Sequence, residues 1–254
     1  MALALGLAPA PAYAAQTDGA ALRAQNDASA DPGEAGDDTE TDEIDMPSPP
    51  AEKAANLSKE GTNVVVGGST YKVTSNSSKT VAFVSPKAAA SVTVPDTVKI
   101  GGVTYLVTEI APKAFALAAK KLTSVKIGKN VKVIGESAFT GCKKLTKVTG
   151  AAAVTIIKAK AFLGCKKLKK CAPFSSKVLV KVGAQAFKGC KKLKKLTACS
   201  KLLKKAAVKG SLKGSSVKTI KVKVGAKKLN KKFVKKYKKI FKKKNSGKKV
   251  KVKK

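Results

Sequence analysis

The stretch I-G-E-S-A-F-T-G-C-K-K-L, residues 134–145, is decisive for the fold because it recurs along the chain. Similar copies occupy residues 157–168 and 182–193, and a looser copy, I-A-P-K-A-F-A-L-A-A-K-K-L, occupies residues 110–122. The copies align on phenylalanines that recur at nearly even intervals: Phe115, Phe139, Phe162 and Phe187. Self-similarity at a fixed period of about 20 to 50 residues indicates a solenoid, in which each copy forms one turn stacked on the next.

Each copy has the residues needed to build one turn of such a solenoid. An Ile or Val is followed by Ala-Phe, then by Gly-Cys, which suits a tight corner, and by Lys-Lys, which exposes two charges. The Leu that follows begins a short strand, with a second apolar residue three positions later. Stacked turns bring equivalent positions to within about 5 Å of one another, the spacing of paired strands. We therefore predict an internal column of Phe139, Phe162 and Phe187 and outer columns of lysines.

The pattern I-x-x-x-A-F-x-x-C-x-x-L-x-x-V resembles the BspA-like leucine-rich repeat of bacterial surface and secreted proteins. The resemblance covers residues 105–200, with about four repeats. The first copy departs from it, with Ala118-Ala119 in place of Gly-Cys, and the pattern fades after Leu196. The resemblance implies a non-catalytic scaffold used for adhesion or for contact with a protein or a host. It identifies no ligand.

The acidic N-terminal part of the chain, residues 1–60, predicts two segments without a core of their own. Residues 1–15 begin with an apolar run and end near Ala12-Tyr13-Ala14, which fits a cleavage site, so we interpret them as the remnant of a signal peptide. The alternative is a disordered Ala/Pro tail. Residues 16–60 are acidic and rich in Ser and Pro, which predicts a disordered linker. That linker serves either as a spacer or as a screen over the basic part of the chain.

The rest of the chain predicts an α/β solenoid between two caps. Alternating apolar residues separated by Gly-Gly over residues 61–108 indicate β-hairpins and a β-rich N-terminal cap. Residues 109–205 hold the leucine-rich repeats, and residues 206–254 a lysine-rich strand-helix-strand C-terminal cap. Apolar residues four positions apart predict a helix over residues 227–244, ended by Asn245-Ser246-Gly247. Its apolar stripe either covers the last turn or lies on a membrane.

Charge is divided sharply along the chain. Residues 1–60 have a net charge of −9, and residues 61–254 have a net charge of +47, almost entirely from lysine. Such a basic body predicts binding to polyanions. Lysine lacks the planar fork of arginine, which disfavours specific readout of nucleic acid. The lysines expected to contact a polyanion, by stacking at the corners or by lying on the helix, are Lys143, Lys144, Lys166, Lys167, Lys191, Lys192, Lys235, Lys236, Lys238 and Lys239. The alternative is an ordinary solvated face.

Catalytic and metal sites find little support in the composition. The chain has no histidine, and only three carboxylates follow residue 60, so we predict no enzyme, no metal and no cofactor. Cys142, Cys165 and Cys190 share one repeat position and predict a buried apolar column, with a disulfide between turns as the alternative. A bridge between Cys171 and Cys199 is a further hypothesis.

We therefore expect a monomeric scaffold that is secreted or held at the cell envelope. The sequence contains no run of 18 apolar residues, so we predict no transmembrane segment. The expected partner is an anionic cell-wall polymer, or a host surface protein or glycan. One alternative is a free secreted binder of nucleic acid or glycan, although few aromatic residues are available for base stacking. Another is a fragment whose catalytic domain lies elsewhere.

Overall fold

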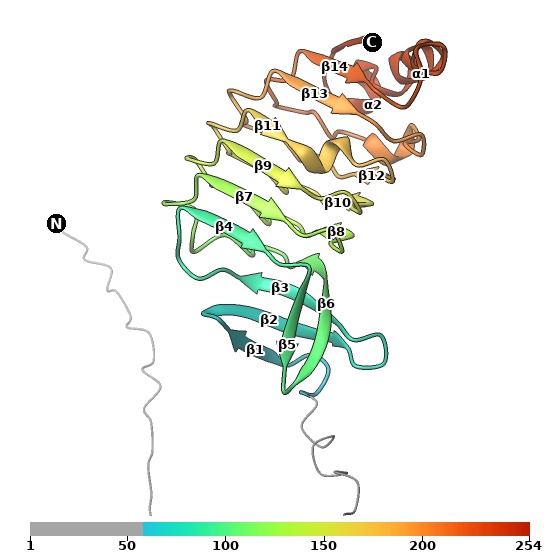
Figure 1. Ribbon diagram of the computed structural model, residues 1–254. Coiled ribbons are helices and arrows are strands. Elements are labelled where there is room, and N and C mark those ends of the chain that lie inside the picture. Colours follow the sequence, from blue (N-terminus) through green and yellow to red (C-terminus); the bar gives the residue numbers. More distant parts are fainter. Residues whose placement is uncertain (1–57) are drawn as a thin grey trace, which may run out of the picture. The chain divides into compact units, whose positions relative to one another are not determined.

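Parallel strands from successive repeats stack into ladders (Figure 1). The computed structural model describes residues 58–254, which belong to one compact unit, so the predicted signal-peptide remnant and most of the acidic linker lie outside the described residues. One ladder joins β4 (Ser91–Val94), β7 (Ser124–Ile127), β9 (Lys147–Gly150) and β11 (Lys170–Cys171) in parallel. A second joins β8 (Val133–Ile134), β10 (Ile156–Ile157) and β12 (Lys181–Val182), which contribute two residues each. The predicted solenoid is confirmed.

A column of phenylalanines runs between the ladders and forms the centre of the core. The rings of Phe139 and Phe162 lie 5.0 Å apart, and those of Phe162 and Phe187 lie 5.5 Å apart, with interplanar angles of 3° and 2°. Phe115 continues the column at 4.4 Å from Phe139, and Phe83 continues it at 5.7 Å from Phe115. All five side chains are fully buried. The predicted column is thus confirmed, and it is longer than the repeats that suggested it.

The first strands attach to the start of the solenoid through this column and through backbone pairing. β1 (Asn63–Val66), β2 (Ser69–Ser75) and β3 (Thr80–Ser85) form an antiparallel meander, and β5 (Thr97–Ile100) forms a hairpin with β6 (Val103–Ile110). β3 pairs in parallel with β6, which in turn pairs with β8. Hairpins and solenoid therefore share one sheet, and whether the hairpins act as a separate cap stays a prediction.

The chain ends in a third, parallel sheet with a helix beside it. The sheet contains β13 (Lys195–Ala198), β14 (Thr219–Val222) and β15 (Lys251–Lys253), and α1 (Lys227–Ile240) packs near β14 and β15. The predicted helix over residues 227–244 is too long. Asn245 ends α1 by donating its side-chain amide to the carbonyls of Lys239 and Ile240, at 3.0 and 3.1 Å. A short second helix, α2 (Lys243–Ser246), follows before Gly247 adopts a left-handed conformation.

The turns continue beyond the point where the sequence pattern fades. We call residues 134–198 the regular turns and residues 203–222 the variant turn. Ser211, Leu212 and Ser215 of the variant turn are buried where the regular turns have Ala, Phe and Cys. The backbone shows this equivalence, because Gly210 and Gly214 hold positive φ angles of 65° and 71°, as Gln185 and Gly189 do at 55° and 75°. Backbone hydrogen bonds join the two layers, from Gln185 N to Gly210 O at 2.9 Å and from Gly189 N to Gly214 O at 3.0 Å.

The predicted class and repeat number therefore need correction. The regular secondary structure of the described residues is mostly strand, and their helices are α1, α2 and the 3₁₀ turns η2 (Ala172–Ser175) and η3 (Ala206–Val208). They form a β-solenoid, so the α/β class is not supported. The prediction of about four repeats was too low, because a variant turn without Phe or Cys still takes the backbone path of a repeat.

Candidate functional site

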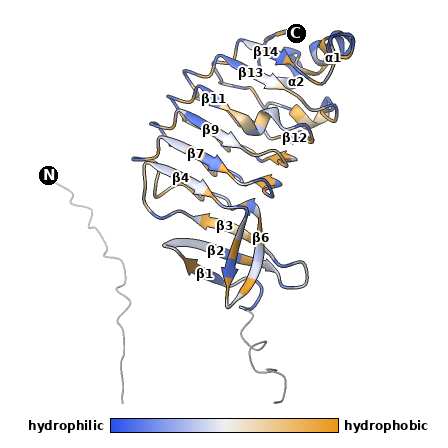
Figure 2. Ribbon diagram, in the orientation of Figure 1, coloured by the Kyte–Doolittle hydropathy of each residue, from blue (hydrophilic) through white to orange (hydrophobic). Residues whose placement is uncertain are grey.

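The corner lysines lie in stacked rows on one side of the solenoid. Gly141, Gly164 and Gly189 turn the chain with positive φ angles of 76°, 74° and 75°. Successive corners are joined by backbone hydrogen bonds, from Gly141 N to Leu163 O at 2.8 Å and from Gly164 N to Lys188 O at 2.7 Å. We call the exposed lysine pairs that follow these glycines the corner face: Lys143, Lys144, Lys166, Lys167, Lys191 and Lys192. Figure 2 shows hydrophilic colour at these loops and along much of α1.

The predicted helix lysines are exposed as well, but one of them has a structural contact. Lys236 donates its ammonium group to the carbonyl of Lys201 at 3.0 Å and lies 5.1 Å from the centre of the Phe233 ring. Tyr237 and Ile240 of the same helix are buried, and the Tyr237 hydroxyl donates to the carbonyl of Ser200. The apolar stripe therefore packs on the end of the solenoid, and Lys236 helps to hold it there. The other predicted helix lysines are exposed to solvent: Lys235, Lys238 and Lys239.

A third group of lysines lies on the ladder itself, outside the set of lysines predicted to contact a polyanion. We call the outward side of β4, β7, β9, β11, β13, β14 and β15 the strand face. Lys147 lies directly opposite Lys170 across β9 and β11, and Lys221 lies opposite Lys253 across β14 and β15. The sequence signal was the lysine two positions after the repeat leucine. Whether such lysines of successive turns lie opposite one another depends on the strand register, which the spacing in the sequence does not establish.

The cysteines form a buried column of free thiols. Cys142, Cys165 and Cys190 are fully buried, and each thiol donates to the carbonyl of the phenylalanine one turn earlier, at 3.9, 3.0 and 3.1 Å. Side-chain hydrogen bonding with the thiols of Cys142 and Cys190, followed by burial, raises the pKa of the Cys165 thiol. The predicted column is confirmed. The hypothesis of a Cys171–Cys199 bridge is wrong, since both are free thiols in the structure.

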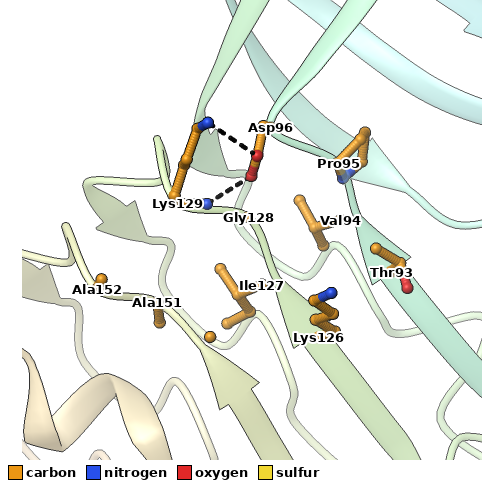
Figure 3. Close-up of a pocket in the computed structure, with 11 residues that line it drawn as sticks. Thr93, Val94, Pro95, Asp96, Lys126, Ile127, Gly128, Lys129, Ala151 and Ala152 are labelled. Atoms are coloured by element: carbon orange, nitrogen blue, oxygen red, sulfur yellow. Dashed lines mark hydrogen bonds and ion pairs between the residues drawn. The ribbon is translucent and has the colours of Figure 1, made fainter.

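Two of the four carboxylates of the described residues form ion pairs. Asp96 accepts a hydrogen bond from the backbone of Lys129 at 2.7 Å and pairs with its ammonium group at 3.6 Å (Figure 3). These residues border a hollow of about 350 Å³ at the ends of β4 and β7. Glu109 pairs with Lys158 at 3.3 Å. Among residues 58–254, no cluster of three or more His, Cys, Asp or Glu side chains could hold a metal ion.

The geometry of repeated turns, buried phenylalanines and Gly-Cys corners agrees with a family comparison. The model of the BspA type leucine rich repeat region matches residues 108–241, with six copies, which is more than half of the chain. The chain belongs to the BspA-type leucine-rich repeat family. The six copies include the region where the sequence pattern fades, in agreement with the variant turn.

Solved structures support the same fold. A leucine rich cell surface protein from Faecalibacterium prausnitzii A2-165 is similar with a TM-score of 0.54 and 23% identity, over 66% of this chain and 47% of that chain. The leucine rich repeat protein of T. pallidum is similar with a TM-score of 0.50 and 22% identity, over 63% of this chain and 71% of that one. This BspA-type chain thus matches about half the length of the first protein. No protein of curated function matches the sequence significantly.

Within residues 58–254, no helix combines the length and the apolar character that crossing a bilayer requires.

Proposed function

We propose that this protein is a non-enzymatic interaction scaffold of the bacterial cell surface, held there by contacts between its lysines and anionic wall polymers. The observation that carries the proposal is the excess of positive charge without partners. Residues 58–254 contain 51 lysines and four acidic residues, and only two ion pairs form among them. The remaining surface is a polycation that attracts polyanions over a distance of about 8 to 10 Å at physiological salt.

The stacking of turns makes this charge costly to the folded protein unless it is screened. Corner lysines and strand-face lysines of successive turns lie one strand spacing apart, roughly 5 Å. Like charges directly opposite each other in a ladder are destabilising. A bound polyanion removes this repulsion, so binding and folding stability are expected to increase together. The family and the likeness to a cell surface protein support placing the scaffold outside the cell.

The test is sedimentation of the full chain with purified bacterial cell walls, either intact or stripped of anionic polymers, between 50 mM and 1 M salt. We expect retention on intact walls, a steep loss of retention with salt, and no retention on stripped walls, because the contact is electrostatic. Equal retention on both preparations, or none at any salt, contradicts wall docking. Release of the wall-bound protein by DNA or by a sulphated glycan would instead favour a free secreted polyanion binder.

A further inference from the structure

The strand face is interrupted where the first ladder ends. Among residues 58–254, no strand pairing joins β11 to β13, so the ladder of β4, β7, β9 and β11 stops before the sheet of β13, β14 and β15 begins. The reason lies in the sequence Ala172-Pro173-Phe174-Ser175, which leaves the strand as the 3₁₀ turn η2. Pro173 has no N–H to donate to a ladder. Phe174 instead turns inward and packs against Phe187 at 6.0 Å.

The interruption opens a hollow on the strand face. Its volume is about 470 Å³, and it lies between β9, β11, η2 and β13. We call it the ladder hollow. Its polar lining consists of three lysines and three hydroxyl residues: Lys169, Lys170, Lys195, Thr149, Thr197 and Ser175. Ser175 already donates to the carbonyl of Thr197 at 3.0 Å, and Thr149 donates to the carbonyl of Val125 at a long 3.4 Å.

No carboxylate lines the ladder hollow or lies on the strands around it. The two ion pairs of the described residues, Asp96–Lys129 and Glu109–Lys158, involve none of the lining residues. Lys170 also faces Lys147 directly across β9 and β11. Three lysines therefore line one concavity together with hydroxyl groups, and no carboxylate lies beside them. This combination matches the acceptor oxygens and the negative charge of a phosphate group.

The surroundings of the ladder hollow also restrict the kind of polymer that carries the phosphate. Nucleic acids without sequence preference are held by stacking of bases on aromatic side chains as well as by charge. The lining of the ladder hollow contains no aromatic residue and no arginine. The strand face contains none either, since the outward residues of its strands are Ser, Thr, Lys and Gly. These features favour a phosphodiester polymer without aromatic bases.

We propose that the ladder hollow is the specific docking site for a phosphate group of a linear polyol-phosphate polymer of the cell wall, whose neighbouring phosphates lie along the strand face. This inference rests on the proposed wall docking and makes it more specific. It assigns recognition to the strand face rather than to the corner face. The corner lysines then contribute a general attraction, while the ladder hollow supplies directed hydrogen bonds.

The test compares two triple variants of the full chain that lose the same charge. One is Lys169→Gln/Lys170→Gln/Lys195→Gln in the ladder hollow, and the matched control is Lys143→Gln/Lys166→Gln/Lys191→Gln on the corner face. All six side chains are exposed, so both variants are expected to fold, and circular dichroism checks this. The probe is soluble, fluorescently labelled poly(glycerol phosphate), titrated by anisotropy at 50, 100 and 200 mM salt.

We expect the hollow variant to lose about tenfold or more in affinity, and the control about threefold or less, because phosphate-binding lysines contribute charge-assisted hydrogen bonds. The salt dependence should also become shallower in the hollow variant, since each phosphate contact releases counterions. Replacement of the same three lysines by arginine should preserve binding.

Equal losses of affinity in the two variants would contradict the ladder hollow as a specific phosphate site, while leaving the proposed wall docking intact. Tighter binding of double-stranded DNA than of poly(glycerol phosphate) by the native chain would overturn it too. Failure of the native chain to bind poly(glycerol phosphate) at any salt would contradict the proposed function itself.

Discussion

The regular turns and the variant turn follow the same backbone path with different interiors. The regular turns place Ala, Phe and Cys at the centre of each layer, and the variant turn places Ser211, Leu212 and Ser215 there. The rings of the regular turns stack on one another, whereas Leu212 offers no ring to Phe187. The comparison teaches that backbone pairing between layers maintains the solenoid even when the repeated side chains are replaced. The side chains set how stable each layer is.

The largest expected effect comes from removing a ring in the middle of the column. Phe162→Ala should lower the free energy of unfolding by about 3 to 5 kcal/mol, because it leaves a cavity and removes two ring contacts. Leu212→Ala should cost less, since Leu212 has no stacked neighbours. Urea unfolding followed by circular dichroism measures both. Leu117→Ala is the control, because Leu117 is 92% exposed. A greater loss in Leu212→Ala would contradict the importance of stacking.

The regular turns have alanine at a buried position where the variant turn has serine, so each residue can be replaced by the other. The Ser211 hydroxyl is buried without a hydrogen-bond partner among the described residues, while Ala186 occupies the same place one turn earlier. Ala186→Ser should destabilise the protein by about 1 to 3 kcal/mol, because it buries an unsatisfied hydroxyl. Ser211→Ala should stabilise it by about 1 kcal/mol for the same reason. Thermal melts of the two variants check these signs. Stabilisation by serine at position 186 would show that the interior accommodates a hydroxyl.

Backbone conformation gives a smaller difference between the turns. Ser137, Lys160 and Gln185 hold positive φ angles of 55°, 54° and 55° in the regular turns, and Gly210 holds 65° at the equivalent place. Gly210→Ala should cost about 1 kcal/mol, because the left-handed conformation is unfavourable for a residue with a Cβ atom. Gln185→Ala is the control and should change stability less, since that position already carries the strain. A similar loss in both variants in urea unfolding would contradict this account.

The thiols give the smallest effect and a direct check on the cysteine column. Cys199 is half-buried, and the other four cysteines are buried. A thiol reagent should therefore modify one cysteine in the native protein and five after denaturation without reductant. Burial raises the pKa of the Cys199 thiol. Because the thiolate is the reactive form, the rate at which the reagent modifies Cys199 should keep rising at pH values where an ordinary thiol is already fully deprotonated. Fewer than five reactive thiols after denaturation would indicate a disulfide.

Much of this architecture could be predicted from the segment 134–193, because a nearly constant repeat period with inward Phe, Cys and Leu is compatible with few folds other than a stacked one. The phenylalanine column, the buried cysteines and the exposed corner lysines followed from the same pattern. The variant turn did not, since Ser211, Leu212 and Ser215 share only size and burial with the residues they replace. The early end of α1 did not follow either, because it depends on the side chain of Asn245.

The candidate site, too, was predictable in part from the sequence and depends in part on the tertiary structure. The excess of lysine, and hence the attraction to polyanions, is a property of composition and was available from the residues alone. The pairing of Lys147 with Lys170 is a property of register between the strands of two successive turns. The ladder hollow exists because Pro173 breaks the ladder and Phe174 fills the core beside Phe187. Long-range packing brings those residues together, and local sequence preferences carry no record of it.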